Sequence, residues 1–270
     1  MRSLFANKTL GVFTLLSILL ILFIACPLAG TIISTSPALF LQTLQDPEVR
    51  EAINLTFSAS LMATGLTLIL GVPLAYLLAR VSFPGKWLVE GIVDVPVVVP
   101  HSAAGIALLM VFGRQTLLGK AFGLLGIQFV SARPGIIAAM LFVSLSFLVN
   151  AAREGFEAID PRLERVARTL GASPWQVFWH ISLPLAWRNI LSGMILMWAR
   201  GLSEFGAVVI LAYHPMVAPV LLYERFQAFG LRYALPVATL MILICLLAFI
   251  TLRVIANRPN RKDNVHDPIP

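Results

Sequence analysis

Charged residues are scarce in this sequence, and their scarcity excludes an ordinary soluble domain. Only 12% of the 270 residues are Asp, Glu, Lys or Arg, whereas 59% are hydrophobic. A globular domain typically has about a quarter charged residues. The net charge of +7 does not indicate nucleic-acid binding, because the basic residues stand at the boundaries of apolar segments, as they do in membrane proteins. The sequence therefore predicts an all-α integral membrane protein that crosses the bilayer several times.

Cysteine and clustered catalytic side chains are also scarce. The two cysteines, Cys26 and Cys245, lie far apart in apolar segments, so we expect neither a disulfide framework nor a metal site. No group of His, Cys, Asp or Glu has catalytic spacing, which argues against a membrane enzyme. The run from Gly113 to Lys120 superficially matches a phosphate-binding loop, but it has one intervening residue too many and Ala121 replaces the Ser or Thr. We expect no nucleotide site in this chain.

Long apolar runs predict six membrane-spanning helices. They cover approximately residues 9–33, 52–79, 91–113, 134–152, 185–212 and 233–252. The first run is too long for the core of a signal peptide, so we expect an uncleaved helix. The third is irregular, because Pro96 and Pro100 interrupt it. We divide the chain into residues 1–51, a first helix with an external segment; residues 52–252, the transmembrane core; and residues 253–270, a tail expected to be disordered.

The distribution of Lys and Arg predicts the orientation. Of the 20 basic residues, six fall on the side opposite the termini: Arg50, Arg114, Lys120, Arg133, Arg225 and Arg232. Arg200 lies inside a span, and the remaining thirteen share the side of both termini. The positive-inside rule then places both termini, and the loop between the fourth and fifth spans, in the cytoplasm.

This loop, residues 160–184, is the longest polar break in the apolar part of the chain. Asp160 is a favourable N-cap, and Gly171 is suited to end a helix in the left-handed conformation. Ser173 and Gln176 have the spacing of a capping box. We therefore predict a short helix, a glycine turn and a second short helix, with Pro184 opening the next span. The first helix should present one apolar face, formed by Leu163, Val166, Ala167 and Leu170.

The same loop resembles a known motif. Gly171, nine residues, and then Ile181-Ser182-Leu183-Pro184 are similar to the glycine-to-ILP half of the EAA loop of ABC-importer permeases. The resemblance implies a coupling helix that docks into a groove of a cytoplasmic ATPase. The residues implied in this contact are Leu163, Arg165, Val166, Ala167, Leu170, Gly171, Ala172 and Ser173. Arg165 and Val166 stand where the motif has glutamate and alanine, so its acidic contact is not expected here. The alternative is an ordinary amphipathic cytoplasmic loop.

Charged residues inside the predicted spans mark a second candidate site. Arg200 and Glu204 are four residues apart and should share a helix face near the bilayer midplane. His101 follows Pro100 at a similar depth, where Ser102 and the next residues would begin a helix and expose amides to an anion. We predict that His101, Ser102, Arg200 and Glu204 line a translocation path. The alternatives are a structural Arg200–Glu204 pair and a histidine that only packs.

The chain resembles a family over nearly its whole length. Residues 89–113 and 198–225, with their Pro-His-Ser-Ala-Ala-Gly and Ser-Glu-Phe-Gly-Ala runs, are similar to the permeases of molybdate and tungstate ABC importers. The resemblance implies a homodimer of six-helix subunits in a prokaryotic cell (inner) membrane, working by alternating access. It also implies two ATPase subunits, which bind ATP and Mg²⁺, and an external solute-binding protein. A sulfate or thiosulfate permease and an ion-coupled secondary transporter are the alternatives; the latter would call for inverted repeats and more intramembrane carboxylates.

Overall fold

The computed structural model describes residues 8–256, and this part of the chain is helical without a β-strand. It divides into two compact units, one within Met1–Val49 and Leu222–Pro270 and the other formed by Arg50–Leu221. The last helix continues to Ala256. Residues 257–270, most of the tail predicted to be disordered, lie outside the described residues, as do residues 1–7.

The first unit is built around two long apolar helices. Its helices are α1 (Lys8–Ile33), α2 (Pro37–Gln45), most of α12 (Ala218–Phe229) and α13 (Leu231–Ala256). The hydroxyl groups of Thr35 and Thr239 lie 2.6 Å apart and connect the end of α1 to α13. Leu, Ile and Phe side chains along α1 are exposed. Such a surface is suited to lipid or to another apolar helix and not to water.

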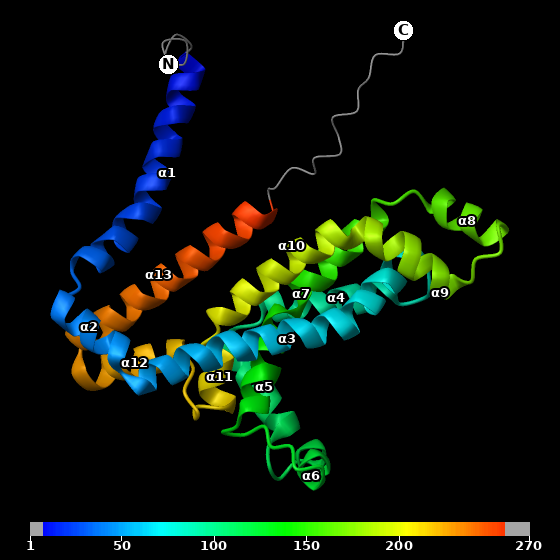
Figure 1. Cartoon of the computed structure of the whole chain (residues 1–270). Coiled ribbons are helices and arrows are strands. Elements are labelled where there is room, and N and C mark those ends of the chain that lie inside the picture. The colour runs from blue at the N-terminus through cyan, green and yellow to red at the C-terminus, as the bar shows by residue number, and fades with distance from the viewer. Residues whose placement is uncertain (1–7, 257–270) are drawn as a thin grey trace. The chain divides into compact units, whose positions relative to one another are not determined.

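The second unit contains both candidate sites. Its helices are α3 (Pro47–Arg80, all but its first residues), α4 (Lys86–Val98), α5 (His101–Phe112), α6 (Leu117–Leu124), α7 (Arg133–Glu157), α8 (Pro161–Thr169), α9 (Pro174–Val177), the π-helix η1 (Phe178–Ser182), α10 (Leu183–Leu202) and α11 (Gly206–Leu211). Figure 1 shows α3, α4, α7 and α10 running beside one another, with α8 past the C-terminal end of α3.

Helix α7 lies at the core of this unit and has many buried residues. Small residues let α10 approach it closely. A Cβ atom at Gly193 would lie 2.7 Å from Cβ of Ala151, and one at Gly155 would lie 2.7 Å from Cβ of Asn189. Small residues at such crossings allow membrane helices to pack backbone against backbone. Buried Leu148 and Ile190 complete the contact. The two helices that lead into and out of the 160–184 loop are thus held together.

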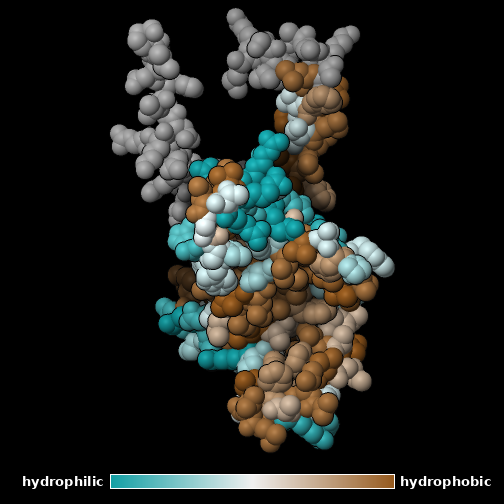
Figure 2. Space-filling view, turned by 90° about the vertical axis from the view of Figure 1, so that its right-hand side faces the viewer, coloured by the Kyte–Doolittle hydropathy of each residue, from teal (hydrophilic) through white to brown (hydrophobic). Residues whose placement is uncertain are grey.

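Length and composition identify four helices of the described chain as able to cross a membrane, or up to five if the bent pair α4 and α5 forms one span. The four are α1, α3, α7 and α13. The predicted fifth span, residues 185–212, forms two helices, α10 and α11, separated by a break at residues 203–205. Figure 2, which faces the α8 end, shows hydrophilic residues gathered there above a largely hydrophobic surface. The count of six spans stays a prediction.

Candidate functional site

The first candidate site lies where two helices break. Helices α4 and α5 meet at an angle of 117°, and Pro100 caps the start of α5. The break follows from the sequence, since proline disfavours a helical conformation in the residue before it. A Cβ atom at Gly206 would lie 2.7 Å from Cβ of His101, and one at Gly105 would lie 2.9 Å from the carbonyl oxygen of Ala207. The two glycines therefore bring the start of α11 directly onto the first turns of α5.

Three predicted path residues meet at this contact. The carboxylate of Glu204 is fully buried, and its Oε2 lies 2.6 Å from Nδ1 of His101 and 3.2 Å from Nη2 of Arg200. Its Oε1 accepts a hydrogen bond of 2.8 Å from the amide of Ala207. Arg200 also donates to the hydroxyl of Ser203 at 3.2 Å. Desolvation makes an isolated buried carboxylate costly, so these donors are what allows Glu204 to lie inside the protein.

Arg200 contacts His101 as well as Glu204. Nη2 of Arg200 lies 2.7 Å from Nδ1 and 2.5 Å from Nε2 of the imidazole, and a guanidinium can only donate. The same Nη2 pairs with the carboxylate of Glu204. The charge of Arg200 is thus balanced inside the cluster by a buried carboxylate.

The cluster is partly accessible. The side chains of His101 and Arg200 are 34% and 24% exposed, and Ser102 is exposed on the first turn of α5. At the start of α5, the amide of Ala104 donates to the carbonyl oxygen of Pro100. It is the first amide of this helix to make such a hydrogen bond. The structure thus brings three of the predicted residues together and places Ser102 beside them. One expectation differs: Arg200 and Glu204 do not share a regular helix, because α10 ends at Leu202.

The second candidate site is the 160–184 loop, whose predicted caps are confirmed. Asp160 accepts a hydrogen bond from the amide of Arg162. Gly171 has φ +93°, and the amide of Ala172 bonds to the carbonyl of Ala167 at 3.0 Å, so the helix ends in a glycine-dependent C-cap. The capping box of Ser173 and Gln176 is present with both of its hydrogen bonds.

The second short helix does not end before the next span, which differs from the prediction. Helix α9 continues through η1 into α10 without a break. Pro184 has no N–H, and its ring would crowd the carbonyl four residues earlier in a regular α-helix. The turn before it is a π-helix, in which the amide of Leu183 bonds to the carbonyl of Phe178, five residues back. The wider turn accommodates the proline, so α9, η1 and α10 form one continuous helix.

The apolar face of α8 points outward. Leu163, Val166 and Leu170 are 50%, 56% and 83% exposed, and Ala167 is half-buried. Arg165 and Ser173 are exposed as well. A surface helix normally turns its apolar face to the core and its charged residues outward. In α8 the apolar face is exposed together with the arginines, and the buried residue is the carboxylate Glu164.

Glu164 joins α8 to two other elements. Nε of Arg80, at the end of α3, donates to both carboxylate oxygens at 2.9 and 3.1 Å. The hydroxyl of Ser182, in η1, donates to Oε1 at 2.8 Å. Nη2 of Arg80 donates to the carbonyl oxygen of Ile159 at 3.2 Å. This cluster was not predicted from the sequence. The available signal was an acidic residue beside the apolar face of a short helix, because a carboxylate needs a cation if it is buried.

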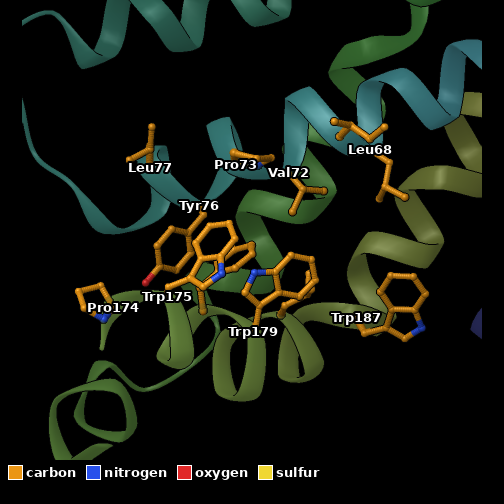
Figure 3. Close-up of a pocket in the computed structure, with 12 residues that line it drawn as sticks. Leu68, Val72, Pro73, Tyr76, Leu77, Pro174, Trp175, Trp179 and Trp187 are labelled. Carbon is orange, nitrogen blue, oxygen red and sulfur yellow. The ribbon is translucent and has the colours of Figure 1, made fainter. Parts of the chain in front are cut away.

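An apolar cavity of about 640 Å³ lies between α3 and the continuous helix α9–η1–α10. Figure 3 shows Val72 and Tyr76 of α3 facing Trp175 and Trp179 across it. The ring of Tyr76 also packs edge-on against that of Phe178, with centroids 5.1 Å apart. Side chains of this kind fit lipid chains or another apolar surface and not a charged solute.

Potential metal ligands are scattered over the part of the chain that the structure describes. Among residues 8–256, no three His, Cys, Asp or Glu side chains lie together in a way that could hold a metal ion. The carboxylate of Asp94, in α4, lies 2.6 Å from the side-chain amide nitrogen of Asn150, which donates a hydrogen bond to it.

Comparison with known families and proteins gives a consistent result. Residues 71–261 match the family described as binding-protein-dependent transport system inner membrane component. The molybdate/tungstate transport system permease protein WtpB of Thermococcus kodakarensis is 44% identical over 256 residues, which cover 94% of this chain and 98% of that protein. The sulfate transport system permease protein CysT of Synechocystis sp. is 33% identical over 247 residues, covering 89% and 85%.

Solved structures share the fold. A bacterial ABC transporter involved in the import of the acidic polysaccharide alginate matches with a TM-score of 0.74 and 19% identity, covering 96% of this chain and 99% of the other. The bacterial alginate ABC transporter in complex with an alginate pentasaccharide-bound periplasmic protein matches with a TM-score of 0.75 and 18% identity, covering 95% and 96%. At this identity the likeness concerns the fold alone.

Proposed function

Because this chain belongs to the family of binding-protein-dependent transport system inner membrane components, we propose that it is the membrane subunit of an ATP-driven importer for molybdate or tungstate. The likeness to molybdate/tungstate permeases over nearly the whole chain carries this proposal. The sulfate permeases are also relatives, so sulfate or thiosulfate is the second candidate for the cargo. An ion-coupled secondary transporter is disfavoured by membership of the family.

The complex would contain two copies of this chain, two cytoplasmic ATPase subunits that bind ATP and Mg²⁺, and an external solute-binding protein. Each copy would have six spans, with α4–α5 and α10–α11 as the broken third and fifth, in the inner membrane of a prokaryotic cell. The excess of basic residues beside the termini and the 160–184 loop supports a cytoplasmic location for both. The core would comprise residues 52–252, flanked by residues 1–51 and 253–270.

Docking of α8 into an ATPase groove would explain why its apolar face is exposed. Leu163, Val166 and Leu170 are exposed, and an isolated helix of nine residues is not stable in water by itself. A groove on the ATPase would cover this face and stabilise it. Ala167, Gly171, Ala172 and Ser173 would lie at the same contact, and Arg165 would meet its edge. ATP-driven closure of the ATPase subunits would then move the α8 helices of both copies together.

The transported anion would pass the two helix breaks, between α4 and α5 and between α10 and α11. There the donors of Arg200 and His101 and the first turn of α5, which includes Ser102, are partly accessible. Rocking of the subunits would open this point alternately to the two sides. Because the charge of Arg200 is paired with that of Glu204, the cluster would pass an oxyanion without binding it tightly. Selectivity among oxyanions would then reside mainly in the binding protein.

Reconstitution tests this function. The permease, its ATPase and its binding protein are placed in proteoliposomes, and uptake of labelled molybdate is measured with excess tungstate, sulfate or no competitor. We expect uptake that requires ATP and the binding protein, is blocked by vanadate, and is reduced by tungstate much more than by sulfate. Uptake driven by an ion gradient without ATP would contradict the proposal. Stronger competition by sulfate than by tungstate would shift it to the second cargo.

A further inference from the structure

Glu164 stands out on α8 because it is buried while its neighbours are not. Its side chain is 11% exposed, whereas Leu163, Arg165 and Val166 on either side are exposed. If α8 docks on an ATPase through the opposite face, Glu164 cannot belong to that contact. Its carboxylate points back into this subunit, towards α3 and η1.

The contacts of Glu164 hold α8 from two directions. Arg80 binds the carboxylate through both oxygens and is itself anchored to the carbonyl of Ile159, at the end of the preceding turn. Ser182 binds Oε1 from the last residue of the π-helix. The ion pair is largely screened from water, with 13% and 11% of the two side chains exposed. Breaking such a pair leaves an uncompensated charge, so it resists separation.

The surrounding packing makes this polar connection important. Between α3 and the helix α9–η1–α10 lies the apolar cavity lined by Val72 and Trp179, among others. At this cavity the two helices meet through packed rings, such as Tyr76 against Phe178, and such contacts are not directional. The Arg80–Glu164–Ser182 cluster adds a connection through directional bonds between the end of α3, α8 and η1.

Resting on the function proposed above, we infer that Glu164 is a positioning residue that makes α8 move as one body with α3 and α10. Displacement of α8 by the ATPase would reach α10 along the chain and α3 through the ion pair with Arg80. Glu164 thereby contributes to the coupling of ATP hydrolysis to transport through contacts inside the subunit. The position one residue later, where the related motif has its acidic contact, is the exposed Arg165.

The test measures uptake per ATP hydrolysed in the reconstituted complex. We expect Glu164→Gln and Arg80→Gln to assemble with the ATPase and to hydrolyse ATP, but to lower this ratio about fivefold or more. Ser182→Ala should lower it less, and the double exchange Arg80→Glu with Glu164→Arg should recover part of it. Arg162→Gln, which changes an exposed charge on the same helix, is the matched control and should leave the ratio unchanged.

Two outcomes of these transport measurements would overturn the inference. One is a normal ratio in Glu164→Gln. The other is a loss of ATPase binding in Glu164→Gln, because Glu164 would then be part of the docking contact. Failure of the proposed function itself would look different, since the wild-type complex would show no ATP-driven uptake.

A distance measurement gives a readout independent of transport. Spin labels at Val81 and Arg162, both exposed, report the separation between the end of α3 and α8. We expect one narrow distance that is the same with and without ATP in the wild type. In Glu164→Gln it should broaden and change with nucleotide. An equally narrow, constant distance in Glu164→Gln would contradict the inference.

Discussion

Nδ1 of His101 lies 2.6 Å from Oε2 of Glu204, and the two residues come from different broken helices. His101 is the first residue of α5, whereas Glu204 lies in the break between α10 and α11. Arg200 contacts both. The cluster therefore connects the two helix breaks through side-chain contacts.

A charge exchange distinguishes path from packing. We expect Arg200→Gln and Glu204→Gln each to reduce uptake by about tenfold or more, because one partner is left without its counter-charge. The double exchange Arg200→Glu with Glu204→Arg should not restore uptake, since the accessible position would then carry a carboxylate towards the anion. Expression and ATPase binding serve as controls. Recovery of uptake in the double variant would show that the pair is structural.

Close packing at the same place gives a stability prediction. In Gly105→Ala the added Cβ would meet the backbone oxygen of Ala207 at 2.9 Å and its Cα at 3.0 Å. Backbone atoms cannot rotate away, so we expect a loss of about 1–3 kcal/mol and a lower melting temperature of the purified protein. Gly65→Ala is the matched control, because a Cβ there meets nothing within 4 Å. Equal melting temperatures of the two variants would contradict this packing.

Gly171 tests the turn between α8 and α9. A Cβ atom at this position has open space around it, so any effect must come from its φ of +93°. A left-handed conformation costs an L-residue about 1–2 kcal/mol, and a β-branched one more. We expect Gly171→Val to remain in the membrane yet to hydrolyse ATP without matching uptake. Gly171→Asn, which tolerates this conformation better, should be much closer to the wild type. Coupled uptake by Gly171→Val would refute the prediction.

The ion pair between Asp46 and Arg225 predicts a pH dependence of stability. Nη2 of Arg225 lies 2.6 Å from Oδ2 of Asp46. Burial by itself would raise the pKa of Asp46. Hydrogen bonds from Arg225 and from the amides of Glu48 and Val49, together with the charge of Arg225, outweigh burial, so the pKa of Asp46 is lowered. A carboxylate whose pKa is lower in the folded state stabilises that state at pH values above its pKa in the unfolded chain. This contribution is lost as the pH falls through its pKa in the folded state.

The difference in melting temperature between wild type and Asp46→Asn measures this contribution. We expect a small, constant difference at neutral and mildly acidic pH, because a partly exposed pair contributes about 1 kcal/mol or less. It should shrink below about pH 4, as Asp46 becomes protonated first in the unfolded state and then, at lower pH, in the folded state. A difference that does not depend on pH would be inconsistent with this ion pair.

Local signals in the sequence predicted much of this molecule. Asp160, Gly171 and Ser173 act through bonds within a few residues, so their caps could be read directly. Pro100 likewise marked the bend between α4 and α5. The lengths and the apolar character of α1, α3, α7 and α13 followed from composition and periodicity.

The rest depends on contacts between distant parts of the chain. Arg80 and Glu164 are 84 residues apart, and spacing alone could not pair them. The break of α10 before Glu204 depends on packing of α11 against α5 through Gly206. Neither the π-helix before Pro184 nor the inward direction of Glu164 has a periodic signature, so both needed the structure.

Disulfide crosslinking tests the role of the 160–184 loop most directly. Single cysteines are placed at Val166 and Leu170, on the exposed face of α8, in a variant whose two native cysteines are replaced. Partner cysteines line the candidate groove of the ATPase. We expect crosslinks from both positions, with yields that change between the ATP-bound and nucleotide-free complex. Cysteines at Gln45 and Gln227 should give none. Crosslinks from Gln45 or Gln227, with none from α8, would contradict both the topology and the coupling role.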